Sequence, residues 1–141
     1  MYLPDINFWL ALSFEAHVHH QTALAWFQAQ EIAPIAFCRF TQQGFFRLAT
    51  NPIVFGDEAM TMSLAWNSYD MFLGDERIYF SDEPSGLESL WRKHTKGFTY
   101  SPKVWSDAYL AAFAEASDAL LVTFDQGFSS YKGVKTTMLN Q

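Results

Sequence analysis

Short apolar runs alternate along the chain with longer segments in which apolar residues recur every three or four positions, and this alternation is its most constraining feature. Parallel strands need long crossovers, which are usually helices, so strands that alternate with helices favour a parallel sheet with helices on both faces. We therefore predict an α/β fold with a mainly parallel sheet of about five strands. The runs predicted as strands are Met1–Pro4, Ile32–Phe37, Arg77–Phe80, Ala119–Thr123 and Val134–Leu139.

The segments between these runs are predicted as helices, and several carry signals for their ends. Asn7 is an expected N-cap. Ser101 followed by Pro102 is typical of an N-cap with proline in the first helical turn. Ser85 is a candidate cap for a later helix. The predicted helices are Asn7–Phe14, His17–Gln30, Thr41–Thr50, Glu58–Leu73, Gly86–His94 and Pro102–Ser117.

Composition bounds the class of protein. A chain of 141 residues matches one domain, so we expect a single domain over residues 1–141. Half of the residues are hydrophobic and 17% are charged, which is the opposite of the balance in disordered chains. No apolar run approaches the roughly 20 residues of a membrane-spanning helix. The single cysteine and the absence of a basic N-terminal region favour a cytoplasmic protein.

The net charge of −6 excludes nucleic-acid binding through an overall positive field, so any such contact would be local or helped by a metal ion. Four basic residues nevertheless gather in one stretch with no acid among them. We predict that this stretch contacts RNA, and the alternative is an ordinary solvated loop. The four residues are Arg92, Lys93, Lys96 and Lys103.

Three aspartates lie next to the first and fourth predicted strands or in the helix that leads into the fourth. Asp5 follows the first strand, Asp125 follows the fourth, and Asp107 lies early in the helix that leads into the fourth. If the first and fourth strands are neighbours, the three carboxylates meet at one edge of the sheet, where ligands of such sheets bind. Crowded carboxylates repel one another unless a cation lies between them. Carboxylate oxygens are suitable ligands for Mg²⁺ or Mn²⁺. Such an ion can activate a water molecule and neutralise the negative charge of a phosphodiester.

Each aspartate alone has a simpler explanation, because Asp is common in turns and at helix caps after strands. The prediction of a site depends on the three together. Three longer segments add to it: the opening LPDINFWLAL, Leu3–Leu12; the block TQQGFFRLATNP, Thr41–Pro52; and WSDAYLAAFAEASDALLVTFDQGF, Trp105–Phe128. In order and spacing they resemble the PIN-domain family, and specifically the VapC-type toxin ribonucleases of type II toxin–antitoxin systems.

The resemblance implies a PIN-like three-layer α/β/α domain and a metal-dependent endoribonuclease. It implies that Asp5, Asp107 and Asp125 are the catalytic residues and the ligands of Mg²⁺ or Mn²⁺. It implies supporting polar roles for Asn7 and Thr123. RNA would be hydrolysed to a 5′-phosphate and a 3′-hydroxyl. A small cognate antitoxin protein and a homodimer are implied as partners.

The chain departs from the family pattern on the helix after the second strand, where a glutamate is usual. The aligned residue is Gln43, a further supporting polar candidate. A neutral amide removes one negative charge and is expected to weaken metal binding. The alternative function is therefore a catalytically weakened PIN-fold module that binds RNA or protein.

Other classes that place acids on an α/β sheet fit less well. In the opening of haloacid-dehalogenase-like phosphatases a second aspartate stands two residues after the first, and here that residue is Asn7. Response-regulator receivers need an acidic pair near the first strand, which this chain lacks. Zinc at His17 and His20 is disfavoured, because no cysteine or third ligand lies near them.

Overall fold

The computed structural model describes residues 1–140, and its centre is a five-stranded sheet in the order β3-β2-β1-β4-β5. All four neighbouring pairs are parallel, and β1 lies directly beside β4, with Pro4 opposite Val122. The α/β prediction and the strand number are confirmed. The strands are β1 (Tyr2–Pro4), β2 (Ile35–Phe37), β3 (Ile78–Phe80), β4 (Leu120–Thr123) and β5 (Thr136–Met138).

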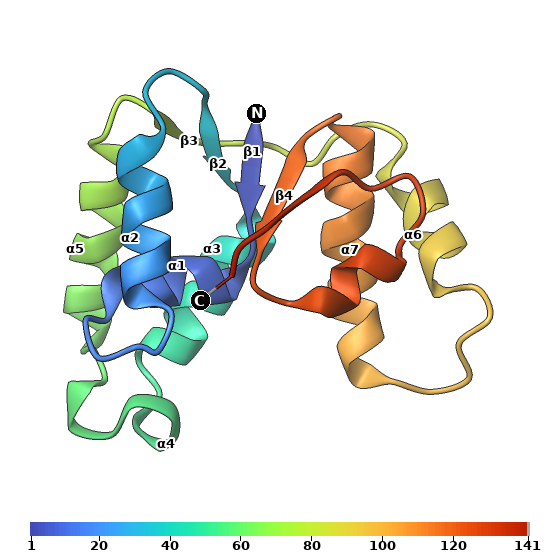
Figure 1. The fold of residues 1–141 in the computed structure, drawn as a ribbon. Helices are drawn as coiled ribbons and strands as arrows, with labels where there is room; N and C mark the ends of the chain where they lie inside the picture. Colours follow the sequence, from blue (N-terminus) through green and yellow to red (C-terminus); the bar gives the residue numbers. More distant parts are fainter. Residues whose placement is uncertain (141) are drawn as a thin grey trace.

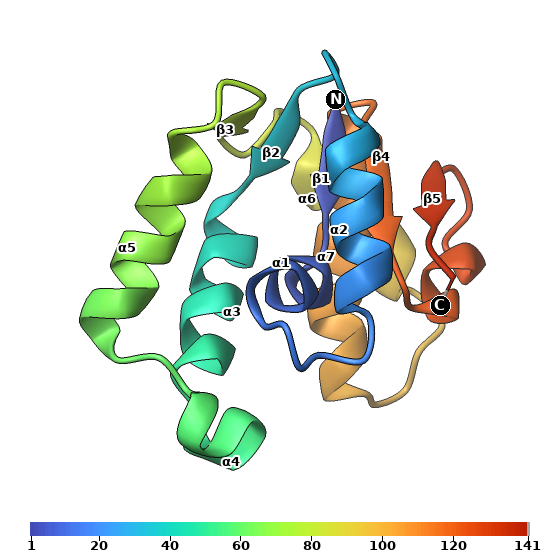
Figure 2. The ribbon, with the colours of Figure 1, turned by 60° about the vertical axis from the view of Figure 1, so that its left-hand side comes forward.

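Helices cover both faces of the sheet (Figures 1 and 2). One face carries α1, α2, α3 and α5, and the other carries α6 and α7, which gives three layers. The helices are α1 (Ile6–Ser13), α2 (His20–Ala29), α3 (Arg39–Ala49), α4 (Pro52–Phe55), α5 (Met62–Leu73), α6 (Leu87–Thr95) and α7 (Pro102–Ala116), with 3₁₀ turns η1 (Gly56–Glu58) and η2 (Gln126–Ser130). Along residues 1–140, no helix has both the length and the apolar character needed to span a membrane.

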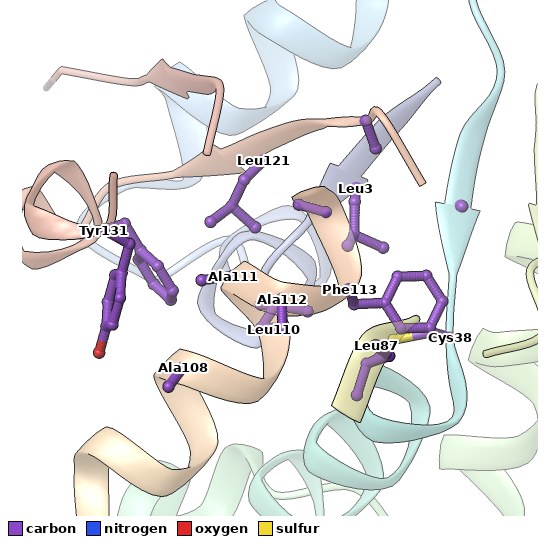
Figure 3. Close-up of a cluster of buried hydrophobic side chains, with 14 residues drawn as sticks. Leu3, Cys38, Leu87, Ala108, Leu110, Ala111, Ala112, Phe113, Leu121 and Tyr131 are labelled. Atoms are coloured by element: carbon purple, nitrogen blue, oxygen red, sulfur yellow. The ribbon is translucent and has the colours of Figure 1, made fainter. Parts of the chain in front are cut away.

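The two faces of the sheet are packed differently. Under α7, the small side chains of Ala111 and Ala112 let the helix approach Leu3 and Leu121 of the sheet (Figure 3). The opposite face is filled with aromatic rings, and Trp9 stacks on Phe37 with ring centroids 3.9 Å apart. Both layers are thus fixed by burial of apolar surface, which holds the elements that end at the carboxyl edge of the sheet.

The first helix begins earlier than predicted. Its N-cap is Asp5 and not Asn7, because Asp5 Oδ1 accepts the backbone N–H of Phe8 at 2.9 Å. The cap therefore holds the Asp5 carboxylate at the junction between β1 and α1. This local hydrogen bond gives Asp5 a structural role beside any chemical one.

Four other predicted helix starts were wrong. The third helix starts at Arg39 and not at Thr41, because its N-cap is Cys38, whose N–H donates to Thr41 Oγ1 at 3.0 Å. The second helix starts at His20, because the N–H of His19 donates to His17 Nδ1 at 3.0 Å in a preceding turn. The segment 58–73 is helical only from Met62, where Thr61 Oγ1 accepts the N–H of Leu64 at 3.1 Å. The N-cap of α6 is Gly86, whose positive φ of 83° suits glycine, and not Ser85.

Candidate active site

Two of the three aspartates are brought together by the sheet itself. Asp5 directly follows β1 and Asp125 follows β4 by two residues, and because these strands are parallel neighbours their carboxyl ends lie at the same edge. Helix α7 contributes Asp107 to the same place. All three line one cavity of about 450 Å³, together with Asn7 and Lys103. The structure thus places the three predicted acids in a common hollow.

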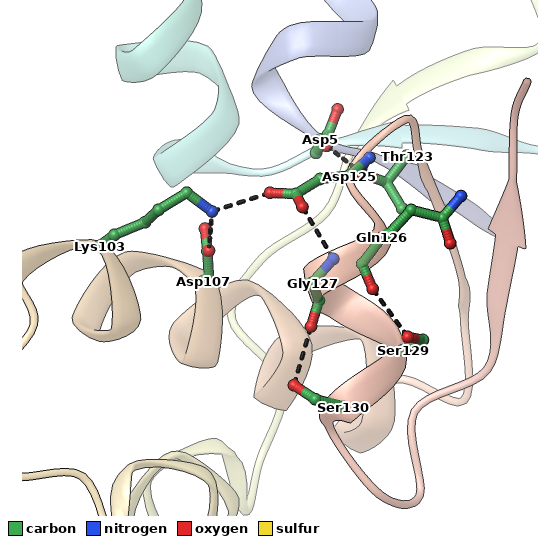
Figure 4. A network of polar contacts seen from close by, with 9 residues as sticks. All are labelled: Asp5, Lys103, Asp107, Thr123, Asp125, Gln126, Gly127, Ser129 and Ser130. Carbon is green, nitrogen blue, oxygen red and sulfur yellow. Dashed lines mark hydrogen bonds and ion pairs between the residues drawn. The ribbon is translucent and has the colours of Figure 1, made fainter. Parts of the chain in front are cut away.

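Lys103 lies between two of these acids. Its Nζ is 2.6 Å from Asp107 Oδ2 and 2.8 Å from Asp125 Oδ2 (Figure 4). The two hydrogen bonds hold the pKa of the Lys103 ammonium above its usual range, and the bond from Lys103 lowers the pKa of Asp125. An internal cation therefore compensates these two carboxylates in the protein alone.

Asp5 lies deeper than the other two acids and is only 7% exposed. Thr123 Oγ1 donates to its Oδ2 at 2.5 Å, while its Oδ1 accepts the Phe8 N–H. Burial nevertheless raises the pKa of Asp5 to about 6, and the negative charges of Asp125 and Asp107 add to the rise. At neutral pH the group is charged but its ionisation is costly, so it favours a nearby positive charge.

Thr123 connects two of the acids. Its hydroxyl donates to Asp5 and accepts the backbone N–H of Asp125 at 2.9 Å, so one buried side chain sets the position of both. Asn7 lines the cavity, and its Oδ1 lies 3.2 Å from His17 Nε2. Both residues thus lie where supporting polar groups were expected.

Gln43 is not brought to this cavity. Its side chain is exposed and lines a neighbouring hollow, together with Arg39 and Trp105. From helix α3, Gly44 and Arg47 line this cavity instead. A Cβ on Gly44 would lie 2.0 Å from Ile6 Cδ1, so the helix approaches α1 closely at this point. The chemical role predicted for Gln43 therefore has no support from its position.

The basic stretch also divides. Of its four members, Lys103 lines the carboxylate cavity. Arg92 pairs with Glu88 at 3.0 Å, and Lys93 pairs with Glu115 at 3.0 Å. Lys96 lines a separate hollow on the far end of α6. Sequence reasoning missed the ion pairs of Lys103; its spacing of four from Asp107 was the available signal.

Arg47 lies one helical turn after Gln43, and the sequence favoured a structural role for it, by pairing with a site carboxylate or a neighbouring acid. In the structure it lines the cavity from α3, whereas the acids come from the ends of β1 and β4 and from α7. A guanidinium in a carboxylate-lined hollow is suited to a phosphate group.

The donor chemistry of the cavity fits a hard divalent cation, because the converging groups are carboxylate oxygens. As residues 1–140 stand, however, no group of three His, Cys, Asp or Glu side chains is arranged around a single point that could hold an ion. The Lys103 ammonium occupies the space between two of the carboxylates. A metal ion would therefore have to displace Lys103.

Comparison with known proteins decides the family. The family model "PIN domain" matches residues 2–134. The chain belongs to the PIN-domain family. Over 99% of both chains it is 45% identical to "Ribonuclease VapC41" of Mycobacterium tuberculosis H37Rv. It is 33% identical to "Ribonuclease VapC44" of the same strain, over 90% of this chain and 87% of that one. The predicted resemblance to the VapC-type ribonucleases is confirmed.

Solved structures show the same fold at low sequence identity. The chain superposes with a TM-score of 0.68 on the "Sarcin-Ricin loop cleaving toxin" VapC20 of M. tuberculosis, which is 18% identical and matches 96% of this chain and 99% of that one. The TM-score is 0.66 for VapBC2 of Rickettsia felis, solved bound to a promoter DNA fragment, at 15% identity over 99% and 98% of the two chains. These likenesses confirm the PIN-like three-layer fold.

Proposed function

We propose that this PIN-domain chain is a metal-dependent endoribonuclease and the toxin component of a VapBC-type toxin–antitoxin pair. One observation carries the proposal. Three carboxylates from β1, α7 and the turn after β4 converge in one cavity, in a chain 45% identical to a ribonuclease along nearly its whole length. The alignment covers every element that builds the cavity.

Asp5, Asp107 and Asp125 would hold Mg²⁺ or Mn²⁺. When bound, such an ion lowers the pKa of a coordinated water and neutralises charge on the scissile phosphodiester. Mg²⁺ usually keeps several waters and needs one or two carboxylates. Three acids, two of them released from Lys103, satisfy this requirement.

Other residues of the chain orient the carboxylates and supply positive charge for the RNA. Thr123 and the Phe8 N–H fix both oxygens of Asp5, so this carboxylate cannot rotate freely. Once released from the acids, the Lys103 ammonium lies beside the cavity and is placed to contact an RNA phosphate. Arg47 offers a second cation from the α3 wall. Attack by water on the phosphorus would leave a 5′-phosphate and a 3′-hydroxyl.

The same charges suggest how an antitoxin acts. A basic segment that enters the cavity would replace Lys103 against the carboxylates and exclude both metal and RNA. Solved relatives include VapBC complexes from Rickettsia felis and Salmonella typhimurium, both with DNA. By analogy we expect a cognate antitoxin for this chain, together with a homodimeric, cytoplasmic toxin.

The test is cleavage of a mixture of tRNA and ribosomal RNA by the purified, antitoxin-free protein with Mn²⁺, with Mg²⁺ and with EDTA. Asp107→Asn removes one cavity carboxylate, and Asp57→Asn, an exposed acid on η1, is the matched control. We expect discrete fragments that need metal, persist in Asp57→Asn and vanish in Asp107→Asn. Cleavage that continues in EDTA, or equally in both variants, would refute the proposal.

A binding module without activity is the second candidate, and the absence of a carboxylate from the α3 wall favours it. That wall presents Gly44 and Arg47, and Gln43 lies outside the cavity. Calorimetric titration with Mn²⁺ separates the two functions. A folded protein that binds no Mn²⁺ at millimolar concentration would be a module and not a metal-dependent nuclease.

A further inference from the structure

A second hollow of about 360 Å³ adjoins the carboxylate cavity. Phe40 and Ser106 line both, so the two hollows are neighbours on the surface. We call the second one the aromatic hollow. Its other lining residues are Arg39, Gln43, Trp91, Trp105 and Tyr109.

The aromatic rings of this hollow are held in place by one another. Trp91 meets Trp105 edge to face, with ring centroids 6.0 Å apart, and meets Tyr109 in the same way at 5.3 Å. The Trp91 Nε1–H donates to the backbone carbonyl of Trp105 at 3.0 Å, and the Tyr109 hydroxyl donates to Glu83 at 2.7 Å. Helices α6 and α7 thus present a preorganised aromatic wall.

Trp105 is 60% exposed in spite of this support. The exposed face of this ring is apolar, so its burial under a flat ligand is favourable. Because the ring is already fixed in position, binding costs little conformational entropy. Residues two apart on a helix do not face the same way, so Trp105 does not share a face with Lys103 or Asp107. The next residue, Ser106, lines both hollows, so a group stacked on Trp105 lies in the hollow that adjoins the carboxylate cavity.

Polar groups complete the hollow. The Arg39 guanidinium lies over the Phe80 ring at 4.6 Å, and its Nη1 donates to Gln42 Oε1 at 2.6 Å. This anchoring leaves further N–H donors of Arg39 for a ligand. The exposed amide of Gln43 offers both a donor and an acceptor. Fixed aromatic rings beside cationic and amide groups are the combination with which proteins bind unpaired bases.

We propose that the aromatic hollow binds an unpaired nucleobase of the RNA, on the nucleotide next to the scissile phosphate, by stacking on Trp105. The inference rests on the proposed ribonuclease function and names a subsite for its substrate. Gln43 takes the edge of the base, and Arg39 takes a flanking phosphate or a base carbonyl. A side chain of an antitoxin is the competing occupant. The position of the hollow beside the cavity proposed for the phosphodiester favours RNA.

The experiment measures binding without cleavage. All variants are made in the Asp107→Asn background, and the probe is an RNA hexamer that contains 2-aminopurine, whose fluorescence falls when it stacks on an aromatic ring. We compare Trp105→Ala, Trp105→Phe and the control Trp66→Ala, which removes a 52% exposed tryptophan from α5. Thermal unfolding verifies that each variant is folded.

Trp105→Ala is expected to weaken hexamer binding by about tenfold or more and to abolish the fluorescence change, because stacking on an aromatic side chain contributes about that factor per base. Trp105→Phe retains most of the affinity, and Trp66→Ala leaves it unchanged. A hexamer with an abasic site at the probe position binds the Asp107→Asn protein equally with and without Trp105→Ala.

Equal hexamer affinity in Trp105→Ala and Trp66→Ala would overturn the subsite. So would a loss of antitoxin binding in Trp105→Ala without a loss of RNA binding, which would assign the hollow to the antitoxin. Either result leaves the ribonuclease proposal standing if the wild-type chain cleaves RNA with metal. Absence of metal-dependent cleavage would refute that function by itself.

Discussion

Replacing the Asp5 carboxylate by an amide tests the electrostatics of the site directly. Asp5→Asn keeps a good N-cap, since Asn also accepts the Phe8 N–H. It removes a buried charge whose pKa is raised from 3.8 to about 6. One pKa unit corresponds to about 1.4 kcal/mol, so ionising Asp5 in the folded protein costs about 3 kcal/mol more than in the unfolded chain.

The sign of the effect follows from proton binding. Between pH 4 and 6 the folded wild type holds a proton on Asp5 that the unfolded chain has lost, so its stability falls as pH rises through this window. Above about pH 6 the loss is complete. In the metal-free state, Asp5→Asn has no such loss. Its gain over wild type therefore grows from near zero at pH 4 toward about 3 kcal/mol at pH 7, less the cost of rearranging the Thr123 hydrogen bond.

The assay is urea unfolding in EDTA at half-unit steps from pH 4 to 7.5, with the exposed Asp57→Asn as the control. Acids distant from Asp5 titrate alike in both proteins, so they cancel in the difference between variant and wild type. Asp57→Asn is expected to differ from wild type by a constant. A difference for Asp5→Asn that is also constant across this range would show that burial does not raise the cost of ionising Asp5, and the reasoning would fail.

Three further substitutions separate the roles of neighbouring residues. Lys103→Met removes two ion pairs, so we expect it to lower the thermal stability of the metal-free protein. We expect it to tighten Mn²⁺ binding in calorimetry by about three- to tenfold, because the ammonium no longer competes with the metal for Asp107 and Asp125. Unchanged affinity would show that Lys103 does not block the site. Gln43→Glu is expected to leave Mn²⁺ affinity unchanged in the same titration, since the side chain lies in the aromatic hollow; tighter binding would place it at the carboxylates. Thr123→Val removes a fully buried hydroxyl, and we expect it to lower the free energy of unfolding in urea by about 2 kcal/mol. We also expect the pH midpoint of Mn²⁺ binding to rise, because Asp5 loses a donor that favours its charged form. A midpoint at or below that of wild type would contradict the assigned hydrogen bond.

The sequence was sufficient to predict the parts of the site that depend on strand order. Apolar runs located β1 and β4, and the rule that ligands bind at the carboxyl ends of parallel strands placed Asp5 and Asp125 together. It failed where a single turn of helix decides the outcome. The family resemblance assigned Gln43 to the site, but in α3 it is Gly44 that lies against Ile6 and lines the cavity, whereas Gln43 faces the neighbouring hollow.

The sequence also did not predict contacts between residues that lie far apart along the chain. The spacing of Lys103 and Asp107 is visible within one helix, whereas the bond from Lys103 to Asp125 spans 22 residues and depends on how α7 packs beside β4. The aromatic hollow likewise needs α6 and α7 to lie side by side before Trp91 and Trp105 can meet. Such pairs follow from tertiary packing, which local patterns do not specify.

The distribution of charge explains how an acidic protein can bind a polyanion. The net charge of −6 opposes RNA at a distance, and part of the basic stretch is already neutralised, Arg92 by Glu88 and Lys93 by Glu115. The cations that line the two adjoining hollows are instead Lys103, Arg47 and Arg39, from α7 and α3. Affinity for RNA would then come from a few short-range phosphate contacts and base stacking, so the dependence of binding on salt should be shallow. A steep dependence, matching six or more released counterions, would show that RNA follows a different, more basic surface.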